Sequence, residues 1–397
     1  MKRNLKSILL TSITTIMATT FISGSIFNAT VFAGYNDKPK EVKEIRVNKN
    51  NERIIDYDEA IEMATKENSS LKEISDTIDF IDYSRSMMYR DNTLPELPDN
   101  GNYLVTAARF QKLIAVNGLN TQEKNLGISE DLTKLSIEAA VKSSMTTITA
   151  LEKNYKLAKD ALEIGKEQLS QTSTMYRMGM VSQIDYEKAM KEIANKEQEL
   201  KQIELSIKQE YNSFRKLIGL KEDENFEIEY DIDFEPVEEI TDMESYINTK
   251  IKTDLGLKIE RANLDATEYG LNMFVDTGDG TEYEKRKLDN INAERSYKDN
   301  VKAKGNSIRN AYIGLKNSET ERKVLESKLA QAKADFETAK VNYQVGNITK
   351  LNYDMANLAV IQAEVALEQH TLTYDINKFM FENTSLLGGG SPNNSSK

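Results

Sequence analysis

The sequence predicts an all-α fold in which two tandem repeats each form a long antiparallel coiled-coil helix hairpin. The first observation is a repeat, because the stretch Tyr176–Ala189 returns as Tyr343–Ala356. The second is that apolar residues flanking each copy recur at alternating spacings of three and four, the heptad pattern of packed helices. The third is composition, because 29% charged residues, no Trp and only 5 Pro suit long, solvent-exposed helices better than a compact globule.

Each copy of the repeated stretch has the chemistry of a tight turn between two helices. Gly179 and Gly346 can adopt the left-handed conformation that ends a helix. Ser182 and Thr349, three residues later, can cap the helix that returns. A capping box would be completed by the residues a further three positions on, Asp185 and Asn352. Each turn on its own reads as a simple hairpin connection, and it is the duplication that makes the pair a candidate site.

Residues 1–33 have the pattern of a cleavable export signal. Lys2 and Arg3 give a basic start, residues 8–28 carry no charge, and Val31-Phe32-Ala33 has the small-residue pattern of a cleavage site. An uncleaved anchor helix is the alternative, because the uncharged run is nearly long enough to span a bilayer. Residues 34–53 are polar and predict a flexible linker. The chain has no Cys, so it must fold without disulfides and cannot carry a lipoprotein anchor.

The first repeat is predicted to span residues 54–220. A helical pattern begins near Asp56 and is broken over residues 91–102 by prolines and a glycine. Helix is expected to resume after this break, with a second interruption between Gly118 and Gly127. The longest helix is then predicted from Ser129 to Tyr176, before the turn and the returning helix.

Residues 221–242 connect the two repeats. From Phe226 to Phe234 apolar and acidic residues alternate, and this period of two predicts a short edge strand. The second repeat, residues 243–388, is expected to open with its own helix and to repeat the rising and returning arms. The glycine- and serine-rich residues 389–397 predict a disordered tail.

Composition argues against several classes of function. The net charge of −12 becomes −15 when the three positive charges of the signal are removed, which makes nucleic acid and anionic membrane surfaces poor partners. The single histidine, His370, stands at a heptad position and reads as a packing residue. A loop with Asp276, Asp279 and Glu282 fails the spacing of a calcium-binding loop. We therefore predict no enzyme activity, no cofactor and no metal site.

The order of these motifs resembles the TolC family of outer-membrane efflux proteins over nearly all of residues 54–388. The resemblance rests on the paired Tyr-x-x-Gly turns, on the helix openings at Tyr57–Asn68 and Met243–Leu257, and on the closing stretches Leu217–Leu220 and Leu386–Gly388. It implies a homotrimer that forms a passive export tunnel, in an efflux or type I secretion-like system. The hairpin tips would dock a membrane-anchored adaptor of the inner transporter. The candidate docking residues are Tyr176, Met178, Gly179, Ser182, Tyr343, Gly346 and Thr349.

The resemblance carries over less well to the closed end of a family tunnel. Tyr343 matches the tyrosine that helps to latch the aperture, but Ile348 stands where the family has a latching arginine. The two aperture aspartates of the family fall on Asn352 and Met355. The candidate aperture residues that remain are Asp185, Tyr343, Asn352 and Asp354. An acidic ring at the aperture is therefore in doubt.

The chain also departs from the family where the strands of an outer-membrane barrel would be. Residues 91–130 are interrupted by Pro and Gly, and Val275–Thr281 is long enough only for a loop. We therefore predict no outer-membrane barrel. The expected location is the cell envelope, in the outer membrane by resemblance, or at the cell surface or wall of a bacterium without one. A structural or adhesive coiled-coil protein of the cell surface is the alternative function, and a peptide- or lipid-binding envelope protein is a third.

Overall fold

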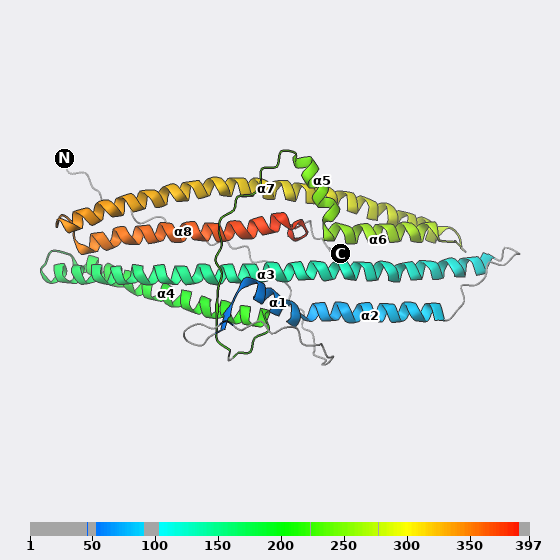
Figure 1. Ribbon diagram of the computed structural model, residues 1–397, viewed down its shortest axis with the longest axis horizontal. Coiled ribbons are helices and arrows are strands. Elements are labelled where there is room, and N and C mark those ends of the chain that lie inside the picture. The colour runs from blue at the N-terminus through cyan, green and yellow to red at the C-terminus, as the bar shows by residue number, and fades with distance from the viewer. Residues whose placement is uncertain (1–45, 47–52, 91–102, 223, 277, 389–397) are drawn as a thin grey trace. The chain divides into compact units, whose positions relative to one another are not determined.

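Long helices in antiparallel pairs make up most of the described chain (Figure 1). The computed structural model describes residues 46, 53–90, 103–222, 224–276 and 278–388, which lie within one unit of the chain, Glu44–Lys397. The predicted signal peptide, nearly all of the predicted linker, the predicted break over 91–102 and the predicted tail lie outside the described residues. Within them, the predicted all-α hairpin fold is confirmed, with two short strands between the helices.

The first repeat opens with two short helices rather than one. Its elements are β1 (Arg53–Ile55), α1 (Tyr57–Glu67), α2 (Ser69–Arg90), α3 (Tyr103–Arg177) and α4 (Gln183–Leu217). Asp56 caps α1 by accepting from the backbone N–H of Glu59 at 2.8 Å. Asn68 separates α1 from α2 and accepts from the backbone N–H of Leu71 at 3.1 Å. An Asx side chain therefore starts each helix by satisfying a free donor of its first turn.

The second repeat follows the same plan. Its elements are β2 (Phe226–Ile228), α5 (Met243–Thr253), α6 (Leu255–Asn272), α7 (Thr281–Gln344), α8 (Lys350–Glu382) and a 3₁₀ turn, η1 (Thr384–Leu386). Asp242 caps α5 through the backbone N–H of Ser245 at 3.0 Å, and Asp254 caps α6 through that of Leu257 at 3.0 Å. These two aspartates occupy the places of Asp56 and Asn68 in the first repeat.

The predicted interruption between Gly118 and Gly127 is wrong, because α3 runs as one helix from Tyr103 to Arg177. A glycine inside a helix costs about 1 kcal/mol relative to alanine, and two of them do not break a helix that has packing partners along its length. Near these glycines α3 packs between α2 and α6. Tertiary packing therefore extends the helix past residues that are poor helix formers.

The predicted edge strand is shorter than the alternating pattern suggests. Only Phe226–Ile228 forms a strand, which pairs in parallel with Arg53–Ile55 in the register Arg53↔Phe226 and Ile55↔Ile228. The strand at Arg53–Ile55 was not predicted. Further on, the connecting segment bonds to helices instead, because the backbone N–H of Val237 donates to the hydroxyl of Tyr374 at 2.8 Å. Burial and the carboxylate of Glu319 raise the pKa of Tyr374, so its hydroxyl stays protonated.

The long helices lie side by side in a row. Toward the hairpin turns the order is α4, α3, α8, α7, and toward the opposite ends it is α2, α3, α6, α7 (Figure 1). Helices α3 and α7 run the full length of the row. Helices α4 and α2 lie end to end along one side of α3, and α8 and α6 lie end to end between α3 and α7. Among the described helices, the one at each end of the row therefore has a helical neighbour on one side only.

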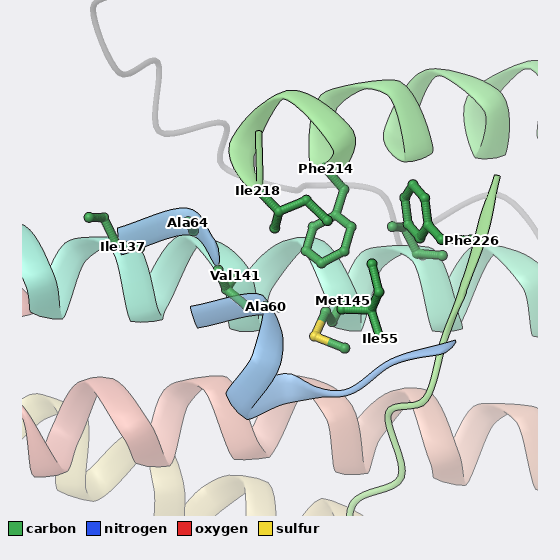
Figure 2. Packing of buried hydrophobic residues seen from close by; sticks show 10 residues of the cluster. Ile55, Ala60, Ala64, Ile137, Val141, Met145, Phe214, Ile218 and Phe226 are labelled. Atoms are coloured by element: carbon green, nitrogen blue, oxygen red, sulfur yellow. The ribbon is translucent and has the colours of Figure 1, made fainter. Parts of the chain in front are cut away.

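An apolar core lies at the joint where the end of α4 meets the region of α1 and the start of α2, beside α3 (Figure 2). Met145 and Val141 of α3 belong to one cluster with Phe214 and Ile218 of α4, and Ile55 of β1 is also part of it. The remaining members come from α1, α3 and β2: Ala60, Ala64, Ile137, Ile148 and Phe226. Burying this many aliphatic and aromatic side chains is the main stabilising term at the joint, at roughly 1.5–3 kcal/mol for each large side chain.

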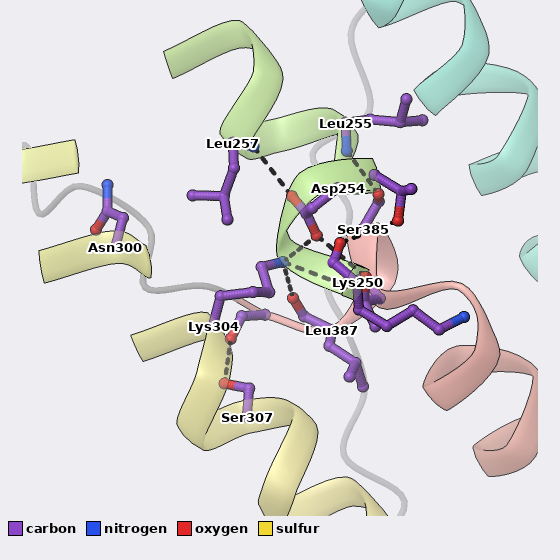
Figure 3. Close-up of polar contacts among 12 residues, drawn as sticks. Lys250, Asp254, Leu255, Leu257, Asn300, Lys304, Ser307, Ser385 and Leu387 are labelled. Carbon is purple, nitrogen blue, oxygen red and sulfur yellow. Dashed lines mark hydrogen bonds and ion pairs between the residues drawn. The ribbon is translucent and has the colours of Figure 1, made fainter. Parts of the chain in front are cut away.

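A buried ion pair holds the equivalent joint of the second repeat (Figure 3). Lys304 of α7 lies 3.2 Å from Asp254, and their side chains are 7% and 0% exposed. Lys304 also donates to the backbone carbonyls of Thr384 and Leu387, at 3.1 and 2.7 Å. The backbone N–H of Leu255 donates to Ser385 at 2.9 Å. These contacts, which we call the C-terminal clasp, fix the segment after α8 against the start of α6.

Candidate functional site

The turn of the first hairpin has the geometry that the sequence predicts. Gly179 has a φ of +69°, which ends α3 in the left-handed conformation. The backbone N–H of Met180 donates to the carbonyl of Met175 at 2.9 Å, which closes the end of the helix. Ser182 then caps α4 by accepting from the backbone N–H of Asp185 at 3.2 Å, while its hydroxyl donates to the Asp185 carboxylate at 2.8 Å.

The turn of the second hairpin repeats this geometry. Gly346 has a φ of +78°, and the backbone N–H of Asn347 donates to the carbonyl of Asn342 at 2.8 Å. Thr349 caps α8 by accepting from the backbone N–H of Asn352 at 3.3 Å. Both tips are therefore tight turns closed by backbone hydrogen bonds and a helix cap, and both lie at the same end of the row (Figure 1).

A stacked tyrosine pair stands behind each turn. The rings of Tyr176 and Tyr186 are 4.9 Å apart and inclined by 6°, and those of Tyr343 and Tyr353 are 5.2 Å apart and inclined by 24°. Each pair joins the rising helix to the returning helix of one hairpin, and such ring contacts stabilise by about 0.5–1.5 kcal/mol. The partner of Tyr343 is therefore within its own hairpin.

The tips expose apolar side chains to solvent. Met178 is 62% exposed and Met180 is 69% exposed. On the first tip Met175, Tyr176, Ile184 and Met190 are also exposed, and on the second Val341, Tyr343, Val345 and Met355. Exposed apolar groups gathered at one end of a protein mark a surface that contacts another molecule. We call the exposed residues of the two tips the apolar tip surface.

The two hairpins meet along a polar seam between α3 and α8. Close to the tips, Lys350 donates to Glu167 at 3.0 Å and to Asp354 at 2.9 Å. Farther from the tips Lys153 pairs with Glu368, and Lys142 pairs with Asp375, both at 2.7 Å. Beside the Lys153–Glu368 pair, Gln369 donates to Asn154 at 2.8 Å. The joint within each repeat thus has buried contacts, whereas the seam between the hairpins near the tips depends on charged groups in contact with water.

The structure gives each candidate aperture residue a local partner. Asp185 and Asn352 take part in the helix caps, Asp354 pairs with Lys350, and Tyr343 stacks on Tyr353. Sequence reasoning missed the contact of Lys350 with Glu167. The spacing of Lys350 and Asp354 does reveal an i,i+4 pair, but nothing in the sequence joins them to a residue 183 positions away.

The remaining titratable candidates have ordinary structural partners. His370 of α8 has its Nε2 atom 3.0 Å from the hydroxyl of Ser318 on α7, and burial lowers the pKa of the imidazole. In the loop before α7, Asp276 and Asp279 accept from backbone N–H groups two residues on. No group of three or more candidate metal ligands occurs in the part of the chain that the structure describes. Nor does any helix among those residues combine the length and the apolar character needed to cross a membrane.

Comparison with known proteins gives matches among solved structures. No protein-family model and no curated protein matches the chain. The CmeC outer membrane channel of Campylobacter jejuni matches with a TM-score of 0.62 and 12% identity, over 84% of this chain and 87% of its own. A membrane protein from Pseudomonas aeruginosa matches at 0.60 and 12%, over 90% and 99%. The outer membrane protein VceC of Vibrio cholerae matches at 0.60 and 13%, over 84% and 96%.

The chain with its duplicated hairpins thus shares the fold of bacterial outer membrane channels. More particularly, the fold is TolC-like, as the sequence resemblance implies. At this level of identity the likeness establishes the fold alone, so the function has to be argued from the surfaces described above.

Proposed function

We propose that this chain is the tunnel component of an export system, of the efflux or type I secretion-like kind. It is exported by a cleavable signal peptide and works in the cell envelope as a homotrimer. Its tips dock a membrane-anchored adaptor, and the inner transporter behind that adaptor supplies the energy. The tunnel itself is a passive conduit without cofactor or catalytic residue.

The observation that carries this proposal is the duplicated apolar tip surface at one end of the row. Turns closed by backbone hydrogen bonds and helix caps keep both sets of apolar side chains at the end of the hairpins. A protein that served only as a rod has no need for such a surface at its tips. The surface suits an adaptor that contacts both hairpins at once, and the docking residues are the seven predicted from the sequence: Tyr176, Met178, Gly179, Ser182, Tyr343, Gly346 and Thr349.

The row of helices supports assembly from several copies. Helix α7 at one end of the row exposes Leu288, Ile313 and Val324, which lie on one helical face. At the other end α2 exposes Phe80 and Tyr83, and α4 exposes Leu205. A row with two incomplete edges can cover both by pairing the edge of one copy with the opposite edge of the next, and rotational symmetry closes such a head-to-tail arrangement into a ring.

The test is photo-crosslinking from the tip in the native host. Met178 is replaced by a photoreactive amino acid, and the captured protein is identified by mass spectrometry. A variant with the same group at Asp289, an exposed residue of α7 near the opposite end, is the matched control. The proposal predicts a membrane-anchored transporter adaptor from Met178 and not from Asp289. Capture of sister copies or wall components alone would favour the structural coiled-coil protein instead.

A further inference from the structure

The exposed methionines of the described chain are confined to the hairpin tips. They are Met175, Met178, Met180 and Met190 on the first tip and Met355 on the second, and we call them the tip methionines. The other methionines whose side chains are described are buried or half-buried: Met63, Met87, Met88, Met145, Met243, Met273 and Met380. Since the protein also has no cysteine, all of the readily accessible sulfur in the described residues lies at the tips.

Methionine gives a docking surface two properties that leucine or valine would not. Its unbranched side chain and polarizable thioether adapt to partners of different shape. Its sulfur also reacts with a peroxide. A lone pair of the thioether sulfur attacks one peroxide oxygen, the O–O bond breaks, and the products are methionine sulfoxide and water. The apolar side chain becomes polar, and methionine sulfoxide reductases reverse the change.

The buried methionines provide an internal comparison. Met145 is fully buried in the core at the first joint, between α3, α4 and β1 (Figure 2). Met178 and Met180 stand on a turn whose backbone groups are already bonded to each other, and neither side chain helps to hold a helix. Oxidation can therefore change the character of the tips without unfolding the hairpins.

We propose that the tip methionines form an oxidation-sensitive docking surface, in which conversion of Met178 and Met180 to sulfoxides releases the adaptor. This inference rests on the proposed function, because it takes the occupant of the tips to be that adaptor. A peroxide is the co-reactant. The part of the partner surface that faces Met178 and Met180 is expected to be apolar, because thioether groups carry no charge.

The chemical half of the proposal is tested on the purified full chain without any partner. After limited treatment with hydrogen peroxide, peptide mass spectrometry gives the sulfoxide fraction at each methionine. Met178 and Met180 should be oxidised at least tenfold faster than Met145, while circular dichroism shows unchanged helix content. Equal rates at Met145, or a loss of helix with the first sulfoxides, would overturn the proposal.

The functional half uses the adaptor that crosslinking identifies. The chain carries the photoreactive group at the exposed Arg177, is treated with peroxide, freed of it with catalase, and mixed with untreated adaptor. The crosslink yield should fall at least fivefold and return after treatment with methionine sulfoxide reductases. In the Met178→Leu/Met180→Leu variant the treated and untreated yields should be equal, whatever their level. The Met243→Leu/Met273→Leu variant should stay sensitive.

The outcomes separate the two proposals. If the untreated chain captures no adaptor, the proposed function fails and the docking inference fails with it. If the untreated chain captures the adaptor and the oxidised chain captures it equally well, the proposed function stands and the oxidation-sensitive surface is wrong. A fall in yield that Met178→Leu/Met180→Leu does not prevent would also overturn it, because the sensitive residue would then lie elsewhere.

Discussion

Lys350, the first residue of α8, reaches across to Glu167 of α3 and joins the two hairpins close to their tips. The distance between the Lys350 Nζ atom and the nearer Glu167 oxygen is 3.0 Å, and the same ammonium group lies 2.9 Å from Asp354. The carboxylates of Asp354 and then Glu167 raise the pKa of Lys350, so it remains charged at any physiological pH. A contact made of exposed charges can hold the tips together and still be broken easily.

We expect Lys350→Gln to let the two tips move apart without unfolding either hairpin. The chain has no native cysteine, so spin labels at Arg177 and Asn347 can report the distance between the tips by electron–electron dipolar spectroscopy. The distance distribution should broaden in Lys350→Gln, and high salt should broaden it in the unchanged chain because salt screens exposed ion pairs. Lys340→Gln removes an exposed ion pair within α7 and should leave the distance distribution unchanged. An unchanged distribution in Lys350→Gln would show that the contact does not restrain the tips.

We expect the stability of the second hairpin to fall as the pH drops below about 6.5, the ordinary pKa of histidine. The His370 side chain is 11% exposed, its Nδ1 atom has no hydrogen-bond partner among the described residues, and Glu321 lies 4.0 Å from its Nε2 atom. Burial lowers its pKa, with Arg322 adding to the effect and Glu321 opposing it. The unfolded chain therefore binds a proton at a higher pH than the folded chain does, and stability is lost as the pH falls through that interval.

The measurement is the urea midpoint, followed by circular dichroism, at a series of pH values on either side of about 6.5. His370→Gln keeps a polar group near Ser318 and does not titrate, so its midpoint should vary less over this range than that of the unchanged chain. Parallel curves for the two proteins would mean that protonation of His370 does not contribute.

Lys304→Met should be among the most destabilising substitutions in the chain. It leaves the carboxylate of Asp254 buried without its cation, which costs about 3–5 kcal/mol, and it removes two bonds to the segment after α8. Adding Asp254→Asn should restore much of the loss, because an amide can still cap α6 as Asn68 caps α2. Urea unfolding of the single and double variants measures both effects. A double variant no more stable than Lys304→Met would contradict the role given to the buried charge.

Gly179→Ala and Gly314→Ala should change stability in opposite directions. At a φ of +69° an alanine costs about 1–2 kcal/mol, because its Cβ atom crowds the backbone in the left-handed conformation. Gly314 lies inside α7, where a Cβ atom would meet no other group of the described residues within 4 Å. Alanine there should therefore add about 0.8–1 kcal/mol of stability. Thermal unfolding of both variants is the check, and two shifts of the same sign would refute it.

The parts of the fold that sequence could predict are those set by neighbouring residues. The turns at Gly179 and Gly346, with their caps at Ser182 and Thr349, depend on a few adjacent residues. The duplication then made the two-hairpin plan visible. The continuity of α3 through Gly118 depends instead on α2 and α6, which pack against it, and no local signal reveals that support.

The parts that sequence could not predict join distant residues. The strand at Arg53–Ile55 exists because Phe226–Ile228 pairs with it, and the contact of Lys350 with Glu167 spans 183 positions. The buried pair of Lys304 and Asp254 has no counterpart among the described residues of the first repeat. Tyr176 and Tyr343 are equivalent positions of the two repeats, and they are 343 − 176 = 167 residues apart. The same offset makes Ile137, an apolar core residue, the first-repeat equivalent of Lys304. An internal repeat therefore predicts the plan of the second half and not the contacts that hold it.

We propose that copies of this chain close into a hollow ring. Electron microscopy of the purified full-length protein, with averaged views along the helix axes, is the decisive measurement. A threefold ring of helices around an open centre is expected. Single chains, or a solid bundle without a central opening, would show that the tunnel proposal is wrong.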